Sequence, residues 1–178
     1  MPTYRRNIIP GATYFFTVTL LDRSSALLTT HVETLRAAFR YTQQRHPFEV
    51  DAIVVLPEHL HAIWTLPPGD ADYATRWRLI KGHFSRNIPA GETRSPSRSG
   101  KGERGLWQRR YWEHTIRDDE DFERHVDYIH FNPVKHGLVR MARDWGYSSF
   151  HRYVKKGLLP VDWGGCVDAV EGRFGERG

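Results

Sequence analysis

Two groups of polar side chains, far apart in the sequence, are suited to phosphodiester chemistry. His59 and His61 flank Leu60, so on a strand both imidazoles would point to one face and Leu60 to the other. Tyr128 and Asn132 are four residues apart, so on a helix they would share a face. Together the two groups would supply ligands for a metal ion and a hydroxyl nucleophile to one site.

The histidine pair also has a less specific interpretation. The chain contains 10 histidines, so a His-x-His pair on a strand arises easily by chance, as two solvated side chains at a sheet edge. Its position favours a metal site, because Pro57 and Glu58 predict a tight turn directly before it. Ligands that follow such a turn are exposed beside a sheet that fixes their directions.

Tyr128 is similarly ambiguous, since a tyrosine on an amphipathic helix is usually a core residue with its hydroxyl at the surface. Helical spacing, however, places it on a polar face. The other members of this face are His125, Asn132 and Lys135, and the opposite face carries Phe122, Val126 and Ile129. Pro133 disfavours helical geometry at Asn132, so we expect the helix to kink or end there.

The elements that must position these residues follow from the hydrophobic patterns. β-Branched and aromatic residues predict strands over 13–21, 48–56, 59–66 and 106–116. Apolar residues at helical spacing predict helices over 31–45 and 73–87, and a third that begins at 118–121 and carries Tyr128. The order β-α-β-β-α-β followed by a helix predicts an α+β, ferredoxin-like (split βαβ) fold, whose antiparallel sheet has helices on one face.

The chain length of 178 residues suits one domain, which we place at residues 1–140. Within it, residues 89–105 are dominated by Gly, Pro, Ser and charged residues and predict a flexible basic loop, because they bury too little apolar area to order themselves. Residues 141–178, rich in Trp, Tyr and Gly, predict a tail that packs back over the domain.

The composition limits the partners and the compartment. A net charge of +5 favours a polyanionic partner. The single cysteine, Cys166, excludes an intramolecular disulfide framework and cysteine-rich zinc sites. The sequence lacks both the run of roughly 18 apolar residues that spans a membrane and the apolar core of a signal peptide, so we expect a soluble, cytoplasmic protein with no membrane partner.

Three motifs together resemble those of the REP-associated tyrosine transposases, relatives of the IS200/IS605 single-tyrosine transposases in the HUH nuclease superfamily. They are His59-Leu60-His61, residues 107–114 (WQRRYWEH) and residues 128–138 (YIHFNPVKHGL). The resemblance extends from about Tyr4 to Tyr153. The third motif is long and highly specific, whereas His-x-His alone is not.

The resemblance implies a single-stranded DNA endonuclease and strand transferase that acts at REP-type hairpins in bacterial genomes and is therefore associated with the nucleoid. Tyr128 would be the nucleophile, and His59 and His61 would bind a divalent metal, usually Mg or Mn. Asn132 stands where the superfamily often has a glutamine and would be the third ligand. The partner would be a folded single-stranded DNA hairpin (REP/BIME-like) beside a guide tetranucleotide, bound by a monomer or a homodimer.

This assignment is physically consistent. Two neutral imidazoles and an amide oxygen leave a bound ion its full positive charge, although they suit Mn, Co or Zn at least as well as Mg. The ordinary pKa of a tyrosine is near 10, so forming a phenolate at pH 7 costs roughly 4 kcal/mol unless nearby positive charge offsets it. Attack by Tyr128 would leave a 5′-phosphotyrosine and a 3′-hydroxyl, with no nucleotide cofactor.

Basic residues in several segments are candidates for DNA contacts. Each phosphate that they neutralise steepens the fall of log affinity with log salt concentration, by roughly 0.7 on single strands and 0.9 on duplex DNA. Binding should therefore weaken steeply with salt. We expect about half of these cations to be ordinary solvated side chains. The candidates are Arg5, Arg6, Lys81, Arg86, Lys101, Arg109 and Arg110. Most tryptophans are better interpreted as core residues than as stacking platforms for bases.

Two other functions stay open. A ferredoxin-like sheet with basic loops also suits a non-catalytic module that binds single-stranded nucleic acid, although such modules place aromatic residues on the central strands, where this chain has histidines. The other alternative is a metal-dependent hydrolase in which water is the nucleophile and Tyr128 orients it. A DNA strand linked to the protein would distinguish the tyrosine nuclease from both.

Overall fold

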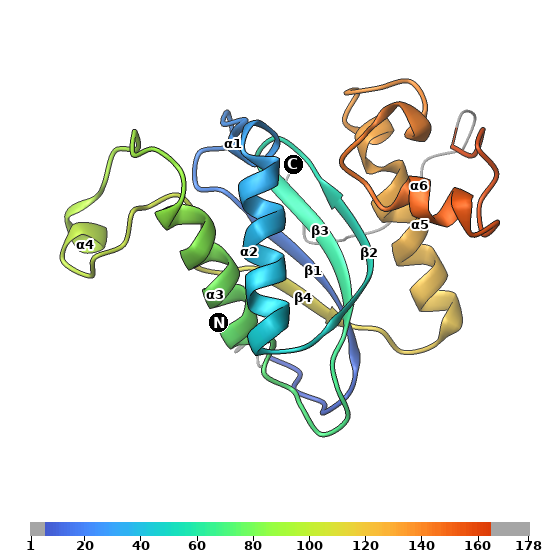
Figure 1. Cartoon of the computed structure of the whole chain (residues 1–178), viewed down its shortest axis with the longest axis horizontal. Helices are drawn as coiled ribbons and strands as arrows, with labels where there is room; N and C mark the ends of the chain where they lie inside the picture. The colour runs from blue at the N-terminus through green and yellow to red at the C-terminus, as the bar shows by residue number, and fades with distance from the viewer. Residues whose placement is uncertain (1–5, 165–178) are drawn as a thin grey trace, which may run out of the picture.

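A four-stranded antiparallel sheet in the order β2-β3-β1-β4 forms the centre of the computed structural model, which describes residues 6–164 (Figure 1). The strands are β1 (Thr13–Thr19), β2 (Glu49–Val55), β3 (His59–Thr65) and β4 (Trp112–Thr115). This strand order is that of the predicted ferredoxin-like fold.

Helices cover both faces of the sheet. The helices are α1 (Leu27–Thr30), α2 (Val32–Arg45), α3 (Tyr73–Arg86), α4 (Pro96–Ser99), α5 (Asp119–Lys135) and α6 (Phe150–Lys155), with a 3-10 helix η1 (Ala142–Asp144). Figure 1 shows α2 and α3 on one side of the sheet and α5 on the other. The predicted fold class is therefore confirmed, and the helix that carries Tyr128 supplies the second layer.

Strict alternation along β3 divides its side chains between two cores. Leu60, Ala62 and Trp64 pack in the core beneath α2 and α3. Ile63 packs in the smaller core beneath α5. Since successive residues of a strand point to opposite faces, His59 and His61 lie on the α5 side with Ile63, and Leu60 anchors the other face as predicted.

The fourth predicted strand, 106–116, is wrong in its first half, because β4 covers only residues 112–115. The segment before it touches the sheet through the backbone bridge between Leu20 and Trp107. Side chains then take its carbonyl groups: Lys81 donates to Gln108 O at 3.0 Å, and Arg98 donates to Trp107 O at 3.2 Å. Backbone hydrogen bonds from Leu21 N to Leu106 O at 2.8 Å and from Gln108 N to Thr19 O at 3.0 Å also join this segment to the end of β1, without a continuous strand.

Helix α5 continues through Pro133 to Lys135, so the expected end of the helix at Asn132 is wrong. Pro133 has no N–H to donate, so α5 loses one backbone hydrogen bond, but only two residues of the helix follow it and the loss is confined to the last turn. The helix then ends in a Schellman motif: Gly137 N donates to Val134 O and Leu138 N to Pro133 O, with Gly137 at φ +69°. The motif 128–138 therefore spans the end of α5 and its cap.

The two segments set apart by composition both follow defined paths within the described residues. The segment 89–105 contains α4 and an ion pair between Arg104 and Glu92 at 2.6 Å. Residues 141–164 pack beside α5 and along the edge of β2, where Ser149 N donates to Ile53 O at 2.8 Å. Within residues 6–164, every helix is too short or too polar to cross a membrane.

Candidate active site

The structure brings the histidine pair of β3 and the tyrosine of α5 together between the sheet and the helix. The ring centroids of His59 and His61 are 5.0 Å apart, and those of His61 and Tyr128 are 5.2 Å apart. All three side chains are at most 2% exposed. The predicted polar face of α5 is therefore directed at the sheet, and the prediction that it lies opposite a separate apolar face is wrong, because Val126 and Ile129 also pack in this core.

Protein partners hold the Nδ1 atom of each imidazole. Thr17 lies opposite His61 in the β1–β3 register, and its hydroxyl is 2.8 Å from His61 Nδ1. The Glu58 carboxylate is 2.8 Å from His59 Nδ1. Burial raises the pKa of Glu58, but the hydrogen bond and charge of His59 outweigh it, so the pKa lies below its usual range. With Nδ1 held in both rings, each histidine would bind a metal through Nε2, the arrangement in which outer partners fix ligand orientation.

Tyr128 has a cation beside its hydroxyl. Lys135 Nζ lies 3.2 Å from the hydroxyl oxygen and 4.8 Å from the ring centroid. Seven residues are about two helical turns, which explains why the two side chains meet. An ammonium group at this distance favours the ionised form of a phenol, because opposite charges stabilise one another. The pair can thus generate an oxygen nucleophile.

Asn132 lies one turn beyond Tyr128 on α5, and its side chain is fully buried. An amide and two imidazoles would together make a neutral donor set suited to a divalent ion. The backbone carbonyl of Asn132 accepts a hydrogen bond from His136 N at 3.0 Å. The His136 ring lies 5.2 Å from that of His59, so the end of α5 closes over the histidine pair.

A second group compatible with a divalent metal lies at the other end of α5. Single ligand atoms of His114, Asp121 and His125 all lie within 4.8 Å of one another. The Asp121 carboxylate already accepts hydrogen bonds from His114 (2.8 Å), Arg124 (3.0 Å) and Arg117 (3.3 Å). Burial raises the pKa of Asp121, but the hydrogen bonds outweigh it, so the pKa lies well below its usual range. The positive charges of Arg117 and Arg124 would repel a divalent cation here. We therefore interpret the cluster as a set of hydrogen bonds and ion pairs that attaches α5 to β4.

Four side chains of this site had no role assigned from the sequence: Thr17, Glu58, Lys135 and His136. Glu58 directly precedes the histidine pair, and Lys135 was placed on the same helix face as Tyr128. The positions of both in the sequence could therefore have assigned them to the site. Thr17 could be found only from the pairing of β1 with β3, which depends on the register between distant segments.

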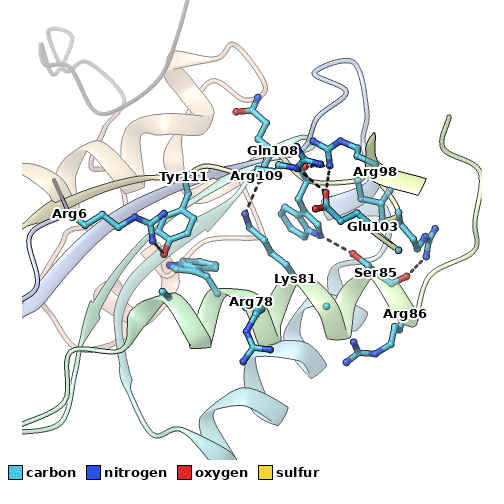
Figure 2. Close-up of a pocket in the computed structure, with 18 residues that line it drawn as sticks. Arg6, Arg78, Lys81, Ser85, Arg86, Arg98, Glu103, Gln108, Arg109 and Tyr111 are labelled. Atoms are coloured by element: carbon cyan, nitrogen blue, oxygen red, sulfur yellow. Dashed lines mark hydrogen bonds and ion pairs between the residues drawn. The ribbon is translucent and has the colours of Figure 1, made fainter. Parts of the chain in front are cut away.

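The predicted DNA-binding cations fall into three groups. One group lines a pocket between α3 and residues 102–111 (Figure 2). Its members are Arg6, Lys81, Arg86 and Arg109. The pocket residues Trp77 and Trp107 belong to the core beneath α2 and α3, whereas Tyr128 belongs to the core on the other side of the sheet. Lys101 and Arg110 are exposed outside this pocket, and Arg5 lies outside the described residues. Trp64, Trp77 and Trp107 are buried, Trp145 and Trp163 are partly buried, and Trp112 is 40% exposed.

Comparison with known proteins gives consistent matches. The family model described as "Transposase IS200 like" matches residues 9–132. A REP-associated tyrosine transposase of Escherichia coli (strain K12) is 48% identical over 99% of this chain and 98% of its own length. A putative REP-associated tyrosine transposase of Haemophilus influenzae is 47% identical over 94% of this chain and 96% of its own length.

One solved structure extends this similarity to three dimensions. It is of a REP-associated tyrosine transposase bound to a REP hairpin, and its TM-score is 0.85 at 47% identity, with 99% of this chain and 98% of that chain covered. Sequence and structure agree over nearly the whole length. We conclude that the chain belongs to the IS200-like transposase family and, within it, to the REP-associated tyrosine transposases.

Proposed function

We propose that the chain is a metal-dependent endonuclease and strand transferase that cleaves single-stranded DNA at REP-type hairpins through a 5′-phosphotyrosine intermediate. The observation that carries this proposal is the position of the Tyr128 hydroxyl, 3.2 Å from Lys135 Nζ, with its ring 5.2 Å from that of His61. The similar structure bound to a REP hairpin supports the substrate class.

We assign the metal-binding residues as His59, His61 and Asn132. The donor set is neutral, and Glu58 and Thr17 fix the two imidazoles with Nε2 as the binding atom. A divalent ion, Mg or Mn, would supply Lewis-acid polarisation of the scissile phosphate. We prefer this position to the His114–Asp121–His125 cluster, because two arginines already neutralise that carboxylate.

Tyr128 and Lys135 would carry out the bond exchange. The Tyr128 oxygen attacks the phosphorus, so a bond from phosphorus to the tyrosine forms while the bond to the 3′-oxygen breaks. Lys135 stabilises the phenolate that attacks. The proton that the Tyr128 hydroxyl gives up balances the one that the 3′-oxygen takes up as it leaves as a hydroxyl, so no proton is consumed overall. The phosphotyrosine bond keeps the DNA end reactive toward a second strand.

Burial of the site favours the tyrosine over water as the nucleophile. Tyr128, His59, His61 and Asn132 are each at most 2% exposed, so bulk water has little access to a phosphate held there. For the same reason, DNA must displace the groups that cover these side chains before cleavage. Among the central-strand aromatics, Phe15, Phe16 and Trp64 are fully buried, which disfavours a binding module that stacks bases on its sheet.

The remaining assignments follow from the proposed substrate. We infer that the protein acts in the bacterial cytoplasm in association with the nucleoid, as a monomer or a homodimer. We infer that residues 1–140 form the nuclease domain and that 141–178 form its tail. Binding of the hairpin should weaken with salt, since the candidate contacts are cations.

The test is covalent capture of an end-labelled DNA hairpin with a single-stranded flank, in Mn or Mg, on a denaturing protein gel. We expect a metal-dependent protein–DNA band for the wild type and its loss in Tyr128→Phe. Tyr153→Phe is the matched control, because its hydroxyl donates to Asp51 O at 3.0 Å away from the histidine pair. Cleavage without a band would instead support water attack, and binding without cleavage would support a non-catalytic module.

A further inference from the structure

A single buried carboxylate, that of Asp121, joins the first turn of α5 to the edge strand β4. The Asp121 side chain is 1% exposed. Its Oδ2 atom lies 2.8 Å from His114 Nε2 of β4. Its Oδ1 atom accepts a hydrogen bond from Arg124 at 3.0 Å and lies 3.3 Å from His125 Nδ1. The carboxylate is therefore held from the strand on one side and from the helix on the other.

The connection from β4 to α5 is short and also depends on Asp121. It consists of residues 116–118. Arg117 N donates to the Asp121 carboxylate at 3.1 Å. Asp121 N donates at 2.8 Å to the side chain of Asp118, the N-terminal cap of the helix. The contacts of Asp121 thus fix the direction in which the chain leaves the sheet to form α5.

The strand partner of Asp121 lies next to the catalytic part of the sheet. His114 pairs with Phe15, which pairs on its other side with Ile63 of the core beneath α5. Directly opposite residues of an antiparallel pair point to the same face, so His114 faces α5 as well. Two residues further along β1, Thr17 pairs with His61. The attachment point of α5 is therefore about 7 Å along the strands from the row that contains His61.

Packed rings connect this attachment point to the nucleophile. The rings of His114 and His125 stack with centroids 4.8 Å apart and 14° between their planes. His125 also packs against Phe15 at 4.8 Å, and Phe15 packs against Tyr128 at 6.1 Å. Tyr128 follows Asp121 by seven residues, about 10.5 Å along the helix that covers this face of the sheet (Figure 1). A shift of the first turn of α5 would therefore be transmitted to Tyr128.

We propose that Asp121 is a positioning residue for cleavage: by holding the first turn of α5 against His114, it fixes where the Tyr128 oxygen meets a bound phosphate. This inference rests on the proposed function for the identity of the nucleophile. Asp121 acts through α5 and touches neither DNA nor metal. Its loss should slow the chemical step and leave both affinities unchanged, because a displacement of about 1 Å between reacting atoms slows a reaction by up to roughly 100-fold.

Single-turnover cleavage of hairpin DNA by Asp121→Asn, at saturating protein and metal, tests the proposal. The amide has the shape of the carboxylate, but in either orientation its NH₂ group faces a donor, Arg117 N or Arg124. We expect the rate to fall roughly 10- to 100-fold, with unchanged Kd for DNA and an unchanged metal titration. A wild-type rate, or a loss confined to DNA affinity, would overturn the proposal.

His114→Phe is the second variant, because it keeps the ring that stacks on His125 and loses only the bond to the carboxylate. It should show the same rate defect as Asp121→Asn, and the double variant should be no slower than the slower single variant. Rate defects that multiply would show that the two side chains act independently and would contradict a shared role. The arginine partners of Asp121 stay in place in His114→Phe, so this variant tests the proposal even if Asp121→Asn does not fold.

Asp70→Asn is the matched control for a loss of stability alone. Asp70 accepts hydrogen bonds from the buried Arg76 at 2.6 and 3.1 Å, beside α3, which carries none of the proposed catalytic residues. We expect this variant to unfold at a lower temperature and to cleave at the wild-type rate when saturated. A merely structural role for Asp121 predicts the same behaviour for Asp121→Asn, so the saturated rate distinguishes the two roles.

Amide hydrogen exchange gives a measurement that does not depend on activity. In Asp121→Asn we expect faster exchange over residues 119–128 and unchanged exchange over residues 132–135, because only the first part of α5 loses its attachment. A covalent band for the wild type together with a wild-type rate in both variants overturns the positioning role alone. Absence of cleavage by the wild type overturns the proposed function, and unchanged exchange in Asp121→Asn would then overturn the positioning role as well.

Discussion

Replacing Lys135 by methionine should slow cleavage while leaving DNA affinity nearly intact. The ammonium lies 3.2 Å from the Tyr128 oxygen, and Lys135 is exposed, so an effective dielectric constant of about 40–80 applies. Coulomb's law then gives roughly 1.3–2.6 kcal/mol of stabilisation for a full phenolate charge. This corresponds to a loss of roughly 10- to 80-fold in the rate of the chemical step, and to less if the charge develops only partly.

The assay is single-turnover cleavage of a labelled hairpin at saturating protein, which separates the chemical step from binding. Lys135→Arg keeps the charge and should retain most of the rate. The rate defect of Lys135→Met should shrink as pH rises toward the ordinary pKa of a phenol near 10, because the phenol then ionises without a neighbouring ammonium group. Cleavage by Lys135→Met within twofold of the wild-type rate at pH 7 would refute the assigned role.

Three further predictions concern metal binding and stability. Thr17→Val removes the Nδ1 partner of His61, so the metal concentration for half-maximal cleavage should rise roughly 10- to 100-fold, and an unchanged titration would exclude this role. Burial lowers the pKa of His130 to about 3, below the unfolded value near 6.5, so the unfolded state takes up the proton first as pH falls. Urea unfolding should therefore show about 2 kcal/mol lost at this site between pH 6.5 and 5, and a His130→Gln variant with the same pH dependence would contradict it. Gly137→Ala, at φ +69°, should lower the free energy of unfolding by about 1–2 kcal/mol, whereas unchanged thermal unfolding would show that the left-handed conformation is not required.

The sequence predicted the fold because its signals are local. Alternation in the run from His59 to Trp64 places histidines on one face and Leu60 on the other, and that placement needs no knowledge of the partner strands. The spacing of Tyr128 and Asn132 on one helix is local in the same sense. The order of the strands in the sheet followed from the order of helices and strands along the chain, because few sheet topologies are compatible with that order.

The parts that sequence reasoning missed depend on contacts between distant segments. Thr17 holds His61 only because β1 and β3 pair in one register. Residues 106–111 have a strand-like composition, but the side chains of Lys81 and Arg98, from other segments, donate to the carbonyl groups of Gln108 and Trp107. Pro133 predicted a helix end from local rules, and the Schellman motif that follows allows the helix to run one turn further. The basic pocket gathers side chains from the N-terminal segment, α3 and residues 98–111, which no local pattern brings together.

The central claim is that Tyr128 becomes covalently joined to DNA, and peptide mapping of the captured adduct tests it most directly. The wild-type protein is incubated with hairpin DNA and metal, digested with nuclease and protease, and analysed by mass spectrometry. We predict that the nucleotide mass is found on the peptide that contains Tyr128, attached to its side chain. An adduct on another residue, or cleaved DNA with no modified peptide, would contradict the account.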